Sequence, residues 1–112
     1  MTALMKAAVY NRNGAAADVL SVVERPMPEP SDGEVCVRLA LSGVNPSDVK
    51  TRARPGMAYD EVIPHSDGAG VVSAIGPGVT DVSVGDQVMS HFVAPWTDGP
   101  YRLEHLQGTL GT

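Results

Sequence analysis

Residues 35–50 read VCVRLALSGVNPSDVK, and this stretch decides the fold class. Its first half carries an aliphatic side chain at every second position: Val35, Val37, Leu39 and Leu41. A period of two is typical of a β-strand, and it places these four side chains on one face. The first half of the stretch therefore predicts the clearest strand in the chain.

The second half of the stretch predicts a helix. Asn45 is a favourable N-cap residue, and Pro46 suits the first helical turn because its missing N–H would have no helical partner there. Pro55-Gly56 would end this helix, and residues 57–67 look like a loop. A strand followed closely by a short helix is expected.

Working outward, short apolar segments bounded by turn residues predict further strands. These segments are 5–10, 20–25, 68–76 and 85–92, with a proline-rich connector over 26–30 and turns at Asp32-Gly33 and Gly76-Pro77-Gly78. Several short strands with few helices predict a mainly β, barrel-like fold. The length of 112 residues fits one small domain.

Charge and hydropathy exclude two classes of partner. The formal net charge is −5, whereas nucleic-acid binding requires clustered Lys and Arg. Lys50, Arg52 and Arg54 lie close together and are interpreted as a solvated helix face. No apolar run approaches the length of a membrane span, so no membrane partner is expected.

Cysteine and histidine usage predicts no metal centre. Cys36 is the single cysteine, so an internal disulfide or a cysteine-based zinc cluster is impossible, and a reduced, cytoplasmic location is the default. His65, His91 and His105 lack metal-ligand spacing and are interpreted as surface or hydrogen-bonded residues. Gly68-Ala69-Gly70 precedes a strand rather than a helix, so we interpret it as a close backbone approach, not a dinucleotide fingerprint.

Several segments, taken in order, resemble one family. They are MKAAVYN at the start, PMPEPSDGEVCVRLALSGVNPSDVKTR in the middle and IPHSDGAGVVSAIGPGVTDVSVGDQV after it. Together they are similar to the N-terminal, GroES-like catalytic domain of medium-chain dehydrogenases/reductases. The resemblance implies a GroES-like β-barrel with short helices, and the segment SHFVAPWTDGP extends it more loosely toward a zinc-free subgroup.

Within that superfamily the sequence resembles the zinc-free quinone oxidoreductase branch. Zinc alcohol dehydrogenases carry Cys-His where this chain has Asn45 and Pro46, and Gly-His-Glu where it has His65, Ser66 and Asp67. The strong zinc ligands, thiolate and imidazole, are therefore missing from those positions. His65 departs from the glycine usual in the zinc-free branch.

The resemblance implies an NAD(P)H-dependent oxidoreductase that reduces quinones, enones or aldehydes by hydride transfer without zinc. NADPH would bind mainly to a Rossmann domain that this sequence does not contain, so residues 1–112 are expected to be one GroES-like domain, incomplete at its C-terminal end. The isolated chain is expected to be inactive. A small-molecule carbonyl or quinone and a second copy in a dimer are the expected partners.

The resemblance also implies roles for particular residues. Asn45 would face the nicotinamide and bind cofactor or substrate, and Asp48 and Asp67 correspond to carboxylates around the lost metal site, although both could simply cap a helix and hold a loop. The candidate catalytic residues are Asn45, Ser47 and Asp48, and the candidate substrate-binding residues are Tyr59, Asp67 and Trp96. Two alternatives to substrate binding stay open. Tyr59 could serve only in packing, and Trp96 could fill the core.

A different class of function remains possible from the sequence. A GroES-like barrel without cofactor could be a binding or structural module that pairs with another chain. A glycine-rich strand-turn-helix unit encoded beyond residue 112 would decide for the enzyme, because that unit holds the pyrophosphate of a dinucleotide.

Overall fold

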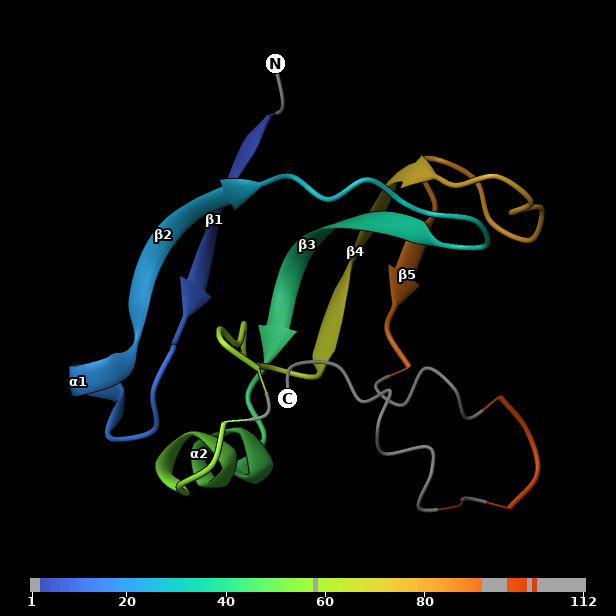
Figure 1. The fold of residues 1–112 in the computed structure, drawn as a ribbon. Coiled ribbons are helices and arrows are strands. Elements are labelled where there is room, and N and C mark those ends of the chain that lie inside the picture. Colours follow the sequence, from blue (N-terminus) through green and yellow to red (C-terminus); the bar gives the residue numbers. More distant parts are fainter. Residues whose placement is uncertain (1–2, 58, 92–96, 101, 103–112) are drawn as a thin grey trace.

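The computed structural model describes residues 3–57, 59–91, 97–100 and 102 of the chain. These residues are mainly β, as the sequence predicted, and Figure 1 shows their arrangement. The elements in chain order are β1 (Leu4–Val9), α1 (Ala16–Val19), β2 (Ser21–Pro26), β3 (Val35–Gly43), α2 (Pro46–Ala53), β4 (Asp67–Ile75) and β5 (Gln87–Met89).

The strands form two antiparallel sheets. β1 pairs with β2, and β4 lies between β3 and β5 in the second sheet. The register of β3 and β4 runs from Val35 opposite Ile75 to Gly43 opposite Asp67. The C-terminal end of β3 and the start of β4 therefore meet at one edge, and α2 lies next to that edge in Figure 1.

The strand β3 lies where the sequence predicted it, and its pairing with β4 is interrupted twice. Two irregularities in the register, between Cys36 and Val37 and between Leu39 and Leu41, interrupt the pairing with β4. An extra residue on one strand changes the side to which the following side chains point. Leu39 and Leu41 are 59% and 73% exposed, so this end of the predicted aliphatic face is not buried among the described residues.

A small core joins the N-terminal hairpin to the loop before β4. Tyr10, directly after β1, pairs its backbone with Val62 through hydrogen bonds of 3.0 and 2.9 Å. Both side chains are buried together with Val19, and Met57 packs against them. Burial raises the pKa of the Tyr10 phenol. This core fixes the loop before β4 against the N-terminal hairpin.

The helix α1 was not predicted. It has four residues, its N-cap is Ala15 and no side chain caps it, so the sequence carries no start signal. The helix forms because it places Val19 in the core beside Tyr10. Tertiary packing thus outweighs weak local preference here.

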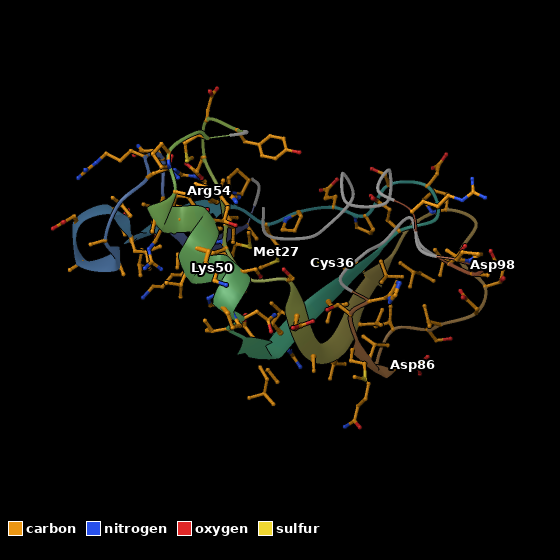
Figure 2. All side chains as sticks on the ribbon, turned by 90° about the horizontal axis from the view of Figure 1, so that it is seen from below. Met27, Cys36, Lys50, Arg54, Asp86 and Asp98 are labelled. Carbon is orange, nitrogen blue, oxygen red and sulfur yellow. The ribbon has the colours of Figure 1, made fainter. Side chains whose placement is uncertain are left out.

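The remaining elements fall close to the predicted ranges. The predicted strand over 85–92 is shorter, because β5 covers only Gln87–Met89 and Phe92 lies outside the described residues. Lys50 on α2 and Arg54 at its C-cap are exposed, as expected for a solvated face, and Figure 2 labels both. Arg52 is half-buried and donates from Nε to the Gly14 carbonyl oxygen at 3.3 Å. No helix in the described part of the chain has the length and apolar character needed to cross a membrane.

The interpretation of Gly70 as a close approach is confirmed. A Cβ atom at this position would overlap the backbone carbonyl oxygen of Arg38 on β3 and lie 2.9 Å from the Cα of Leu39. Only a glycine allows the two strands to lie this close. The small residues at the start of β4, which carries Asp67, therefore allow β3 to pack closely against it.

An ion pair joins β2 to the loop before β4. Arg25 donates from Nε and Nη2 to the two carboxylate oxygens of Glu61, at 2.9 and 2.6 Å, and the two side chains are 39% and 33% exposed. These hydrogen bonds hold the pKa of Glu61 below its ordinary value and raise the pKa of Arg25. The bidentate geometry is the favourable one for a guanidinium and a carboxylate.

We expect the Glu61→Gln substitution to remove one acid-sensitive contribution to stability. Because the pKa of Glu61 is lower in the folded state, its contribution is present above the unfolded pKa and is lost as the pH falls through the folded pKa. The loss in Tm above that window should be a few degrees at most, since exposed pairs are weak. Thermal melts across the acid range would measure it, with the exposed neighbour Asp60→Asn as the charge-matched control. Identical pH dependence in wild type and Glu61→Gln would contradict the assignment.

Candidate functional site

The candidate site lies where β3 ends, α2 begins and β4 begins. Gly43 ends β3 opposite Asp67, the first residue of β4, and Asn45 follows two residues later as the N-cap of α2. Two segments distant in sequence, the β3–α2 junction and the start of β4, thus meet at the same edge of the second sheet. The strand–helix junction predicted from residues 35–50 builds this edge.

Asp48 holds the start of α2. The backbone N–H of Asn45 donates to Oδ2 of Asp48 at 2.7 Å, and the two residues form a reciprocal capping box. Pro46 occupies the first turn, as predicted. Asp48 is 5% exposed, so its carboxylate is fixed beneath the helix N-terminus, where negative charge is favourable. The interpretation of Asp48 as a helix cap agrees with these contacts.

Asn45 and Asp67 form a side-chain pair across the junction. The Nδ2 atom of Asn45 donates to Oδ2 of Asp67 at 2.7 Å. An ionised carboxylate only accepts hydrogen bonds, so the amide nitrogen, not its oxygen, must face Asp67. The amide group carries two N–H donors, and Asp67 takes one of them. The second is the only donor of this side chain left for a ligand within the part of the chain that the structure describes.

His65 and Ser66 occupy the loop immediately before Asp67, and their side chains lie in different surroundings. His65 Nδ1 lies 3.0 Å from Ser42 Oγ at the end of β3, and Ser66 is buried. His65 and Asp67 thus bond different partners, Ser42 and Asn45, while Ser66 between them is buried. His65 is hydrogen-bonded and half-buried.

His65 was not predicted as a site residue. Its backbone has φ of 87°, the one positive value outside glycine among the described residues. The sequence carries a partial signal, because glycine is usual at this place in the resembling branch and glycine favours this conformation. Its partner Ser42 gives no signal, since the contact joins residues far apart in the chain.

Other predicted site residues are not drawn into this cluster. Ser47 lies exposed in the first turn of α2, and Tyr59 is 58% exposed in the loop after α2. No hydrogen bond between described residues joins either side chain to Asn45 or Asp67. Trp96 lies outside the described residues. The structure therefore brings together Asn45, Asp48 and Asp67 from the predicted set.

A separate groove lies on the second sheet. It encloses about 520 Å³ and has a mainly apolar lining, in which Gly68 directly follows Asp67 along the chain. Neither Asn45 nor Asp67 lines it. The polar cluster and the groove are thus distinct features of this sheet.

The donor set of the cluster does not fit a zinc ion. Zinc in proteins needs three or four thiolate, imidazole or carboxylate ligands, and no group of three such side chains is close enough among residues 3–57, 59–91, 97–100 and 102. Asn45 contributes an amide that is already directed at Asp67, and His65 directs Nδ1 to Ser42. The residues are arranged to bond one another.

Comparison with known proteins identifies the domain. The alcohol dehydrogenase GroES-like domain family matches residues 31–112. A chloroplast envelope quinone oxidoreductase homolog from Arabidopsis thaliana is 37% identical over 91 residues, which is 78% of this chain and 28% of that protein. An NADPH-dependent alkenal/one oxidoreductase from the same plant is 33% identical over 106 residues, 91% of this chain and 27% of its own length.

Among solved structures, the chain is similar to a cobalt- and zinc-bound thermostable alcohol dehydrogenase from Pyrobaculum aerophilum. The TM-score is 0.70 at 41% identity, and the match covers 78% of this chain and 26% of that one. The chain thus spans little more than a quarter of the length of these relatives. It is a member of the medium-chain dehydrogenase/reductase superfamily, whose GroES-like domain it carries.

Proposed function

We propose that this chain forms the substrate-side wall of the active site in an NAD(P)H-dependent, zinc-independent oxidoreductase that reduces quinones, enones or aldehydes. The observation that carries the proposal is the Asn45–Asp67 pair at the edge of the second sheet. The names of two relatives, a quinone oxidoreductase homolog and an NADPH-dependent alkenal/one oxidoreductase, support the substrate class. NADPH is the proposed cofactor, bound mainly by a dinucleotide-binding domain outside these residues.

The second N–H of Asn45 is suited to bind a carbonyl oxygen. A nicotinamide supplies a hydride when bound, and the acceptor carbonyl then gains negative charge on its oxygen. A donor that is already oriented before the reaction stabilises this charge without reorganising. Asp67 orients the amide by accepting a hydrogen bond of 2.7 Å from Asn45 Nδ2. Asp48 fixes the backbone of the same residue by accepting a hydrogen bond of 2.7 Å from its N–H. Asn45 can equally donate to the cofactor carboxamide, as the resemblance implies.

The remaining candidate residues have less direct roles in this proposal. Ser47 presents a hydroxyl group in the exposed first turn of α2, two residues after Asn45, and would return a proton to the reduced oxygen. Tyr59, exposed in the loop after α2, would line the substrate entrance together with Trp96. The proposed assembly is a dimer in the cytoplasm, and the net charge of −5 argues against a nucleic-acid partner.

The complete enzyme should oxidise NADPH in the presence of an enone or a quinone, and the isolated 112 residues should not. One wall of a cleft cannot hold hydride donor and acceptor in reacting distance. Steady-state absorbance of NADPH measures the first arm, and fluorescence titration of NADPH against the isolated chain measures the second. Saturable micromolar binding by the isolated chain, or no turnover by the complete enzyme with any enone, quinone or aldehyde, would overturn the proposal.

We expect the activity to survive removal of metal. Because the side chains around Asn45 bond one another and offer too few zinc ligands, dialysis against a chelator should leave kcat within about twofold of its starting value. Elemental analysis of the dialysed enzyme should find less than one zinc per chain. A stoichiometric zinc whose removal abolishes turnover would show that ligands from elsewhere complete a metal site.

A further inference from the structure

His65 occupies a backbone conformation that its side chain makes unfavourable. Its φ is 87°, a region that glycine adopts freely and that other residues rarely adopt. Strained residues of this kind persist where the surrounding structure holds them, and they concentrate at functional sites. His65 stands two residues before Asp67, the partner of Asn45. The contacts of His65 with its surroundings, those of the imidazole included, must therefore offset this strain.

The imidazole has one visible task, a hydrogen bond across the sheet edge. His65 Nδ1 lies 3.0 Å from Ser42 Oγ, and Ser42 lies opposite Gly68 in the register of β3 and β4. The bond thus connects the loop before β4 to Ser42, the second-last residue of β3. No hydrogen bond from another described residue reaches Nε2.

The Ser42–His65 contact lies beside the candidate site. Ser42 precedes Asn45 by three residues, and His65 precedes Asp67 by two, so the Ser42–His65 bond and the Asn45–Asp67 bond are neighbouring ties between the same two segments. A glycine at position 65 would adopt the backbone conformation without strain but would remove the first tie. The Asn45–Asp67 bond and the backbone pairing of β3 with β4 would remain, with one restraint fewer on the loop that leads into Asp67.

We propose that His65 is a positioning residue, which bonds Ser42 through Nδ1 and thereby holds Asp67 where it orients the Asn45 amide. The expected effect on kcat rests on the proposed function. The expected effect on the position of Asp67 does not. It assigns no step of proton transfer to His65, because the imidazole acts through Asp67 and not on the substrate.

Three variants of the complete enzyme test this proposal. His65→Gly removes the imidazole and relieves the backbone strain, so it should fold with an unchanged or higher Tm while kcat falls about tenfold, the loss expected for an imperfectly oriented donor. KM should change by less than about threefold. Ser42→Ala removes the partner and should cause the same loss in kcat.

The double variant Ser42→Ala/His65→Gly should lose no more than either single one, because the two changes remove the same bond. His65→Asn should restore kcat to within about threefold of wild type. Asparagine tolerates this backbone region, and its amide nitrogen is separated from Cα by the same number of bonds as Nδ1 of histidine. Ser73→Ala, which removes an exposed hydroxyl hydrogen-bonded to Cys36 on the same strand pair, is the matched control and should leave kcat unchanged.

Hydrogen–deuterium exchange of the peptide covering residues 62–70 separates this inference from the proposed function, because it needs no turnover. His65→Gly and Ser42→Ala should each raise its exchange rate about tenfold, and His65→Asn should not. If wild type lacks reductase activity but exchange follows this pattern, the proposed function fails and the positioning role stands. Unchanged exchange in Ser42→Ala, additive losses in the double variant, or failure of His65→Asn to restore kcat would overturn the positioning role.

Discussion

Replacing Asn45 by alanine should lower kcat/KM of the complete enzyme by about ten- to a hundredfold. Each factor of ten corresponds to about 1.4 kcal/mol, so the expected loss equals one well-aligned hydrogen bond to developing charge. Asn45 already donates one N–H to Asp67 at 2.7 Å, and the loss of the amide would remove both that bond and the donor proposed for the substrate. Steady-state kinetics with an enone and NADPH measure the effect.

The matched control for this prediction is Asn45→Ser. Asn45 is also the N-cap of α2, and the loss of a cap costs about 1 kcal/mol of stability whatever the catalytic role. Serine is an equally good cap but has no amide, so Asn45→Ser should melt close to wild type and remain slow. Recovery of kcat/KM in Asn45→Ser would show that the residue serves the helix and not the reaction.

Replacing Gly70 by alanine should destabilise the protein by about 2–3 kcal/mol, the loss expected when an added methyl group has no room. The new Cβ would overlap the carbonyl oxygen of Arg38, and neither backbone can move without separating β3 from β4. Denaturant unfolding should show a lower midpoint. Activity at low temperature should fall too, because the same strand pair places Ser42 and Asp67.

Gly68→Ala provides the control on the same strand. A Cβ at position 68 would lie 2.7 Å from Cδ2 of Leu39, the end of a flexible side chain that is 59% exposed and can change its rotamer. We expect a change within about 0.5 kcal/mol. A loss as large as that for Gly70→Ala would mean that any side chain at the start of β4 is harmful, irrespective of which atom it meets.

Local sequence patterns were sufficient for the strands and for α2, where propensity and packing agree. Asn45 and Pro46 begin the helix and the alternation of residues 35–41 marks β3, because each signal is contained in a few neighbouring residues. The irregularities in β3 were not predictable, since a bulge depends on how β4 pairs with it. For the same reason α1 was missed, because only the core around Tyr10 stabilises it.

The candidate site was predicted by resemblance and not by local chemistry. Asn45 and Asp67 were selected because of their positions in a family pattern, and the structure then places them 2.7 Å apart. Asp48 could be anticipated as a cap from spacing alone, since a carboxylate at the third helical position suits a capping box. The Ser42–His65 contact could not be anticipated, because it joins two segments that only the pairing of β3 with β4 brings together.

The backbone pairing of Tyr10 with Val62 has a consequence for the order of folding. The hairpin of β1 and β2 joins strands that are close in sequence, whereas the Tyr10–Val62 pair closes a loop of about fifty residues, and local contacts form faster than distant ones. The hairpin and the second sheet should therefore form first as separate units, and the small core around Tyr10 should form last. Destabilising substitutions at Tyr10 or Val62 would then mainly accelerate unfolding and leave the folding rate nearly unchanged.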